Sequence, residues 1–148
     1  GLRIFTKIDL RDGFWNICLT ERAQELCVMT TEFGCFRYKR MAQGASNRPA
    51  AFQDIMEKVL QPAIDDGCGI LVYLDDITIH SEDWKEHIET VERVLELLRK
   101  ANLRLKLGKC DWGAREITFL GHIVNEEGIR PSNSILKKVQ NWPEVYES

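Results

Sequence analysis

The sequence lacks several features that would place it in a simple class. No apolar run approaches the roughly 20 residues that a membrane-spanning helix needs. There is no excess of basic residues, because 20 Lys and Arg stand against 23 Asp and Glu and the formal net charge is −3. This balance excludes a strongly basic nucleic-acid-binding module as a description of the whole chain, and it leaves local basic patches open.

Cysteine and histidine are sparse and scattered. The five cysteines are Cys18, Cys27, Cys35, Cys68 and Cys110, and no two of them lie within five residues of each other. An odd number without a CxxC pair predicts free thiols in a reducing compartment. Because the pairwise spacing of zinc ligands is also missing, a zinc site that combines Cys110 with a histidine is only a minor alternative.

The size and composition are those of a globular protein. The 148 residues suffice for one ordinary domain or a piece of a larger one. With 44% hydrophobic and 29% charged residues, the chain has the composition of a folded protein and needs no disulfides to hold a core. It begins with Gly1 rather than Met, and no charged and apolar leader follows, so we expect either an excised piece of a longer chain or an N-terminal part that lies elsewhere.

Two segments show the periodicity of amphipathic helices. In the stronger one, apolar residues recur in alternating steps of four and three: Trp84, Ile88, Val91, Leu95 and Leu98. This pattern predicts a helix over Asp83–Ala101, with Ser81 as a good N-cap before it. A second apolar stripe predicts a helix over Pro49–Ala63, which Pro62 and Gly67 end or interrupt.

Short β-prone segments separate these helices. The predicted strands are Ile4–Asp9, Leu26–Thr31, Cys35–Arg40, Gly69–Leu74, Ile77–Ile79, Leu103–Leu107 and Ile117–Val124. The second and third of them read as a hairpin, and a last short helix begins at Pro131-Ser132 and stops before Pro143. The order predicts an α+β fold, in which two helices back an antiparallel sheet in a ferredoxin-like, split βαβ arrangement.

The most unusual motif is the carboxylate pair Asp75-Asp76 between two predicted strands. In a tight turn both side chains point toward the same end of the sheet. Two unit charges about 4 Å apart repel each other by about 4 kcal/mol at an effective dielectric of 20, so cations or solvent must offset the repulsion. A solvated Asp-Asp turn is the plainer interpretation.

Asp9 provides a possible third carboxylate, because it ends the predicted strand Ile4–Asp9 and a turn follows it at once. If the two strands are neighbours, Asp9 and Asp75 meet at one edge of the sheet. Oxygen ligands without His or Cys suit Mg²⁺ or Mn²⁺, and a pair of such ions about 3.5–4 Å apart is the usual clamp for in-line phosphoryl transfer. The alternative for Asp9 is a simple strand-end turn.

Five blocks together resemble a reverse transcriptase, nearest to the gypsy-type branch of long-terminal-repeat retroelements. They are KIDLRDGFWNI, MAQGASNRPAAFQ, YLDDITIHS, LGKCDW and FLGHIV. They occur in the family's order and at its approximate spacing, within residues 4–124. The resemblance implies a polymerase palm at residues 1–128 with part of the fingers in a hairpin at about 16–40, and the start of the thumb or connection segment at 129–148.

The resemblance implies a nucleotidyl transferase that uses two Mg²⁺ ions, with Mn²⁺ as a possible substitute. Asp9, Asp75 and the backbone carbonyl of Leu10 would hold the metals, and Asp76 would be a third, less direct carboxylate. Lys109 would be the general acid for the leaving pyrophosphate. A plain surface lysine is the alternative for Lys109, because Lys106 is close and the alignment here is loose.

The resemblance also implies sites for the nucleotide and the primer. The nucleotide site would consist of the backbone amides of Arg11, Asp12 and Gly13, the ring of Phe14 beneath the sugar, and Gln43. The primer would contact Tyr73 and Leu74 and the primer grip Phe119, Leu120, Gly121 and His122. The plainer interpretations are core packing for Phe14, an exposed loop amide for Gln43, and an ordinary half-buried strand with a Gly kink for the primer grip.

Three positions depart from the family pattern, and none of them is a catalytic carboxylate. Ala42 stands where Pro is common, Gln43 where many gypsy-type members have Phe, and Arg48 where a small residue is usual. The implied function is that of an RNA-directed DNA polymerase fragment, poorly active or inactive alone. Its implied partners are template-primer, dNTP and the remaining fingers, thumb and RNase H segments of the same polyprotein.

The implied location is intracellular, in the cytoplasm or within virus-like particles, with no membrane partner and no secretion. Two other functions remain open. One is a catalytically silent or domesticated palm that acts in binding only. The other is a nucleotidyl cyclase, whose palm-like fold also uses paired carboxylates and which the match at Phe119–His122 disfavours.

Overall fold

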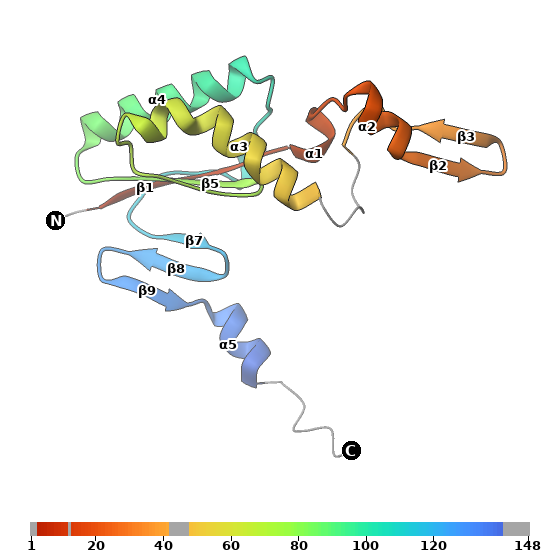
Figure 1. Cartoon of the computed structure of the whole chain (residues 1–148). Coiled ribbons are helices and arrows are strands. Elements are labelled where there is room, and N and C mark those ends of the chain that lie inside the picture. Colours follow the sequence, from red (N-terminus) through yellow and green to blue (C-terminus); the bar gives the residue numbers. More distant parts are fainter. Residues whose placement is uncertain (1–2, 12, 42–47, 141–148) are drawn as a thin grey trace.

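The computed structural model describes residues 3–11, 13–41 and 48–140, without the side chains of residues 14, 16, 48 and 138–140. Figure 1 shows two long helices above a sheet, a second sheet below it, and a hairpin that extends away from both. None of the helices in the described ranges has the length and apolar character needed to cross a bilayer.

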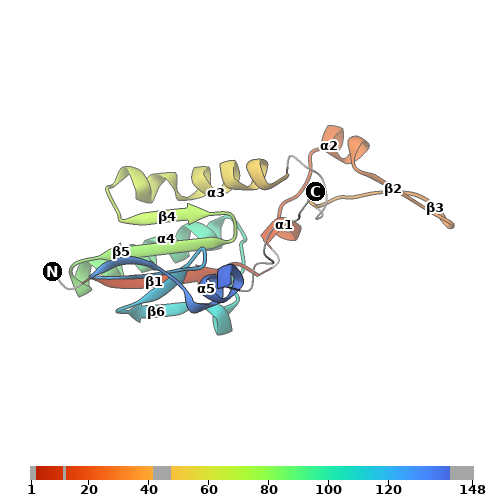
Figure 2. The ribbon, with the colours of Figure 1, turned by 90° about the horizontal axis from the view of Figure 1, so that it is seen from below.

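A four-stranded antiparallel sheet forms the centre of the fold. Its strands are β1 (Ile4–Asp9), β4 (Ile70–Tyr73), β5 (Asp76–Ser81) and β6 (Asp111–Ala114), in the order β4-β5-β1-β6 (Figure 2). β5 lies between β4 and β1, and β1 lies between β5 and β6, so each helical connection passes over one strand. The predicted split βαβ arrangement is therefore confirmed.

Two helices, α3 (Arg48–Asp65) and α4 (Trp84–Lys100), cover one face of this sheet (Figure 1). Both begin and end within two residues of the predicted bounds. Their apolar stripes meet the inward-facing side chains of β1 and β5. The fully or almost fully buried residues of this core are Ile8, Phe52, Met56, Leu60, Ile77, Ile79, Val94 and Leu98. The core therefore lies between the two helices and the face of the sheet that β1 and β5 form.

Two predicted helix boundaries are wrong in detail. Asp83, not Ser81, caps α4, because its carboxylate accepts the backbone N–H groups of Lys85 and Glu86 at 2.8 and 3.2 Å. Ser81 instead ends β5. Pro62 does not interrupt α3. It is exposed in the last turn, and the helix continues past it with one fewer backbone hydrogen bond.

The segment between β1 and α3 projects from the sheet (Figure 1). It contains α1 (Gly13–Asn16), α2 (Glu21–Leu26), β2 (Val28–Thr31) and β3 (Gly34–Arg37). The predicted hairpin is confirmed with shorter strands. The helix α2 was missed, although Thr20 before it is a good N-cap and accepts the Ala23 N–H at 3.3 Å.

The predicted strand Leu103–Leu107 is wrong. Leu103 enters the core, and its N–H donates to Leu98 O at 2.9 Å, so this residue satisfies a carbonyl of the last turn of α4 instead of pairing with a strand. Leu105 forms one isolated bridge with Leu10, and the chain then turns into the short 3₁₀ helix η1 (Leu107–Lys109). The alternation of Leu with charged residues therefore reflects a segment that crosses the end of β1 rather than a strand beside it.

The described C-terminal part forms a second, three-stranded sheet and a helix. Its elements are β7 (Ile117–Phe119), β8 (His122–Asn125), β9 (Gly128–Pro131) and α5 (Asn133–Gln140). The predicted segment Ile117–Val124 is a hairpin, because Leu120 and Gly121 both have positive φ, 48° and 78°, as a tight type I′ turn requires. The predicted last helix is confirmed.

A buried histidine links α4 to the sheet. His87 is 2% exposed, with Nε2 2.7 Å from Thr6 Oγ1 and Nδ1 3.2 Å from Ser81 Oγ. The pKa of His87 is lowered, mainly by burial. The charge of Glu86 raises the pKa by a smaller amount, and the nearby His80 lowers it. The folded protein therefore keeps the His87 ring neutral at pH values at which an exposed histidine would already be protonated.

The free energy of unfolding should fall as the pH decreases through the ordinary histidine range. Because the pKa of His87 is lower in the folded state than the unfolded value of about 6.5, protonation favours the unfolded chain. Urea unfolding at about pH 7.5 and 5.5 measures the difference. His87→Gln should reduce this difference, whereas His122→Gln, at an exposed site, should preserve it; equal pH dependence in both variants would contradict the assignment.

Candidate active site

Three carboxylates gather where β1 ends and β5 begins. Asp9, the last residue of β1, pairs across the sheet with Asp76, the first residue of β5, and Asp75 precedes Asp76 in the turn. The two segments are bonded directly, because Leu10 N–H donates to Asp75 O at 3.2 Å. Asp9 and Asp75 line the same cleft, so the structure shows the expected meeting of these residues, and their role as metal ligands stays a prediction.

Asp75 has the most constrained carboxyl group of the three. Its Oδ1 atom is buried and has no hydrogen-bond partner within the described part of the chain. Burial raises the pKa of the Asp75 carboxyl, and the negative charges of Asp9 and Asp76 raise it further. A buried carboxylate oxygen without a partner, next to two like charges, is a group that a bound cation would stabilise.

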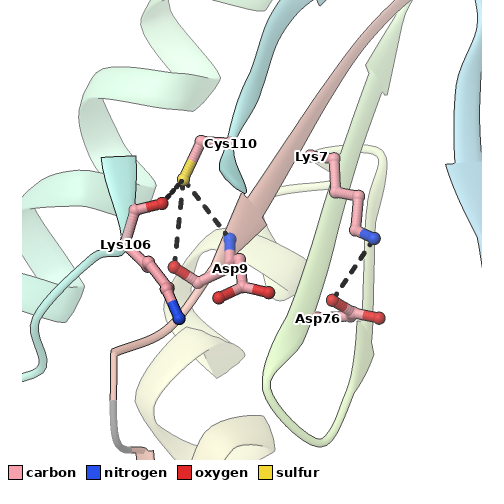
Figure 3. A network of polar contacts seen from close by, with 5 residues as sticks. All are labelled: Lys7, Asp9, Asp76, Lys106 and Cys110. Carbon is pink, nitrogen blue, oxygen red and sulfur yellow. Dashed lines mark hydrogen bonds and ion pairs between the residues drawn. The ribbon is translucent and has the colours of Figure 1, made fainter. Parts of the chain in front are cut away.

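Asp9 and Asp76 are held by different contacts (Figure 3). Asp76 Oδ1 lies 3.5 Å from Lys7 Nζ. The Asp9 N–H donates to Cys110 Sγ at 3.4 Å, as Figure 3 shows. The Asp9 carbonyl accepts the Lys106 N–H at 2.9 Å. These contacts anchor the end of β1 to the segment that follows α4.

The turn that carries Asp75 is clamped by a side chain that the sequence reasoning missed. Leu74 has φ +50°, in the left-handed region that non-glycine residues rarely adopt. Gln53 of α3 accepts the Leu74 N–H at 2.7 Å and donates to Val72 O at 3.0 Å, so one amide holds both sides of the turn. The available signal was only its position as the last residue of the MAQGASNRPAAFQ block.

The cleft next to the carboxylates is open and has a volume of about 840 Å³. Six residues that were predicted to act at the site line it: Asp9, Leu10, Arg11, Gly13, Asp75 and Lys109. Lys106 lines it as well, so both lysines that competed for the general-acid role face the same space. Carboxylates on one side and cations around them can hold a metal-bound polyanion such as a triphosphate.

The other predicted residues lie outside this cleft. Tyr73 ends β4, and Leu74 lies in the turn before Asp75. Phe119, Leu120, Gly121 and His122 form the β7–β8 turn of the second sheet. The Arg11 amide donates to Arg104 O at 2.7 Å, so a contact between this amide and a nucleotide would require that bond to break.

Several predicted positions lie outside the described residues. They are Asp12, Ala42 and Gln43, and the side chains of Phe14 and Arg48. Among the described residues, those of the cleft included, no cluster of three or more His, Cys, Asp and Glu side chains is already arranged around a metal position. The donor set at the cleft is nevertheless of the right type, because it consists of carboxylate oxygens, one of which is buried without a partner.

Gly13 is required by the packing around Asp75. A Cβ atom at this position would overlap Asp75 Oδ1 and would lie 2.8 Å from Phe52 Cζ, whose ring is fully buried. At Gly108, in η1, a Cβ would meet nothing within 4 Å. The two glycines therefore form a matched pair for testing the close approach of α1 to the carboxylate.

Gly13→Ala should lower the free energy of unfolding by about 1–3 kcal/mol, because the added methyl group overfills a packed site. Gly108→Ala should change it by less than about 0.5 kcal/mol. Urea unfolding at neutral pH measures both. Equal stability of the two variants would show that α1 does not pack against Asp75 as described.

A family model described as "Reverse transcriptase (RNA-dependent DNA polymerase)" matches residues 1–124. The chain is 40% identical over 139 residues to the Retrovirus-related Pol polyprotein from transposon 297 of Drosophila melanogaster, which covers 94% of this chain and 13% of that protein. It is 32% identical over 142 residues to the Transposon Tf2-3 polyprotein of Schizosaccharomyces pombe, which covers 96% of this chain and 10% of that protein. The chain thus spans a small part of the length of these relatives.

Solved structures show the same fold. The foamy viral protease-reverse transcriptase in complex with RNA/DNA hybrid superposes with a TM-score of 0.81 and 30% identity, over 96% of this chain and 19% of that chain. A foamy viral protease-reverse transcriptase dRH in complex with double-stranded DNA gives 0.83 and 30%, over 96% and 24%. Sequence and structure therefore agree: the chain belongs to the reverse transcriptase family, as found in the Pol polyproteins of retrotransposons and retroviruses.

Proposed function

We propose that this chain is the palm of a gypsy-type retroelement reverse transcriptase and that Asp9, Asp75 and Asp76 are its catalytic carboxylates. The observation that carries the proposal is the buried, unpartnered Oδ1 of Asp75 at a cleft that Asp9 also lines. In this assignment residues 1–128 are the palm with part of the fingers at about 16–40, and residues 129–148 begin the thumb or connection segment. Strand β9 crosses that boundary, so the two parts share one sheet.

The parent enzyme would extend a primer with dNTPs on an RNA or DNA template. The foamy viral enzymes are described in complexes with RNA/DNA hybrid and with double-stranded DNA, which supports a template-primer as the partner here. The turn at Leu120-Gly121 would contact the primer strand. The rest of the fingers, the thumb and the RNase H segment of the polyprotein would complete the enzyme in the cytoplasm or in virus-like particles.

Asp9, Asp75 and the Leu10 carbonyl would hold two Mg²⁺ ions, or Mn²⁺ in their place, with Asp76 as the less direct carboxylate. When bound, such ions stabilise the negative charge of the attacking and leaving oxygens. The chain itself places the ligands. The β1–β5 register sets Asp9 opposite Asp76, and Gln53 holds the turn of Asp75.

The cations of the cleft would act on the triphosphate. Arg11, Lys106 and Lys109 line it together with Asp9 and Asp75. Lys109 would donate its Nζ proton to the leaving pyrophosphate, which needs a general acid. The structure places Lys106 in the same cleft, so this residue is the competing donor.

A silent palm that acts in binding only is the second candidate. It is favoured by one observation, namely that no complete metal cluster is preformed among the described residues. Primer extension by this chain, followed by a Mn²⁺ titration, separates the two. Mn²⁺ binding without extension would indicate a competent site that needs the remaining polyprotein, and absence of both would favour the silent module.

Asp75→Asn should reduce primer extension by the full-length parent by roughly three orders of magnitude, because a metal ligand loses its charge. The same variant should be more stable than the wild type, since burial and two neighbouring carboxylates disfavour the charged form of Asp75. Asp65→Asn, at the exposed far end of α3, is the matched control and should leave both properties unchanged. Polymerisation by Asp75→Asn near the wild-type rate would refute the assignment.

Gln53→Ala should lower kcat of the parent by about tenfold to a hundredfold with a smaller change in KM, because the strained turn loses both bonds that hold it. Gln61 lies two turns further along the same helix, where its amide bonds only the exposed Asp65 among the contacts described (2.7 Å). Gln61→Ala is therefore the control. If the two variants have the same kcat, the clamp does not position the site.

A further inference from the structure

Lys7 is set into the same face of the sheet as the carboxylates. Side chains alternate along β1, so Ile8 points into the core while Lys7 and Asp9 point to the opposite face. Lys7 Nζ lies 3.5 Å from Asp76 Oδ1, and the side chains are only 19% and 26% exposed (Figure 3). The described ion pairs elsewhere join surface side chains that are 45–70% exposed, which makes the Lys7–Asp76 pair the most shielded of those described.

The sheet register explains why a cation is needed at this position. Asp9 and Asp76 are direct cross-strand partners, and like charges in that relation destabilise a sheet. Asp75 adds a third carboxyl group beside them. Lys7 is itself opposite Thr78, so its own pairing would accommodate an uncharged residue. The Lys7 ammonium group therefore compensates the charge of Asp76, and the strand pairing itself does not require it.

We infer that Lys7 is a positioning residue for metal binding: it is a resident counter-cation that holds Asp76 and leaves Asp9 and Asp75 as the direct ligands. This inference rests on the proposed function, because it assumes a divalent cation at the carboxylates. The ammonium group supplies part of the charge compensation that the cluster needs before the metal arrives. It also repels the incoming metal, so it weakens the affinity of the site.

Removal of this charge has two opposite consequences. Without metal, three carboxyl groups face one another with less compensation, so the protein is less stable. With metal, the repulsion is gone and Asp76 is released as a further ligand, so the ion binds more tightly. Since the pair is partly exposed, solvent screens it, and we expect an increase in metal affinity of about threefold to tenfold.

The test measures Mn²⁺ binding to the 148-residue chain by the electron paramagnetic resonance signal of the free ion, and thermal unfolding with and without Mn²⁺. Lys7→Met should lower the unfolding temperature in a chelator and bind Mn²⁺ about threefold to tenfold more tightly. Lys7→Arg retains the charge and should match the wild type. Lys85→Met loses the same charge at an exposed site in the first turn of α4 and should also match the wild type.

Further variants keep the test decisive. If Lys7→Met does not fold without metal, Mn²⁺ should restore folding. The double variant Lys7→Met/Asp76→Asn should fold, because the unpaired carboxylate is gone. Unchanged or weaker Mn²⁺ affinity in Lys7→Met would overturn the inference. If that variant also bound primer more weakly, Lys7 would be a phosphate contact instead of a positioning residue. Asp9→Asn tests the underlying site: if the wild type binds no Mn²⁺, or if Asp9→Asn binds it equally well, the proposed metal site fails and the inference with it.

Discussion

The antiparallel pairing of β1 with β5 is the constraint on which the site depends. It joins segments almost seventy residues apart and places Asp9 opposite Asp76, with Asp75 in the adjoining turn. Ile8, Ile77 and Ile79 on the other face of the same strands are fully buried under α3 and α4. Because the side chains of a strand alternate, the hydrophobic register that builds the core also determines which carboxylates meet.

This arrangement works against stability at one point. A buried carboxylate oxygen without a partner and two like charges beside it raise the pKa of Asp75 and disfavour its ionised form. The surrounding structure offsets the strain through specific contacts. Lys7 pairs with Asp76, Gln53 clamps the turn at Leu74, and the Lys106 amide holds the carbonyl of Asp9. Local conflict of this kind, supported by a rigid scaffold, is typical of functional sites.

The second sheet lies against the face of the central sheet that is opposite to α3 and α4 (Figure 1). The groove between it and the central sheet is lined by side chains from both, among them Phe5, Thr78, Phe119 and Val124. The Leu120-Gly121 turn thus belongs to a body that packs against the strands carrying Asp9 and Asp76. A nucleic acid bound along this face would contact both sheets, which agrees with the proposed assignment of the turn to the primer.

The amphipathic helices were predictable because their period is local. The steps from Trp84 to Leu98 mark a single buried face whatever that face packs against. The same local reasoning failed at Leu103–Leu107, where alternation reflects one core residue followed by a crossing segment rather than a strand. It also chose Ser81 over Asp83 as the cap, since both are good capping residues and only the length of β5 distinguishes them.

The sequence by itself determined the family of the protein and the candidate residues of its site. Five blocks in order identified the family, and the resemblance marked Asp9, Asp75 and Asp76 as candidate catalytic carboxylates, although each of them also suits an ordinary turn at a strand end. Only the tertiary structure decided which groups support them. Lys7, Gln53, Gly13 and Cys110 contact the site across long separations in the chain. Such contacts follow from strand register and helix placement, which depend on the packing of the whole core and leave no periodic trace in the residues themselves.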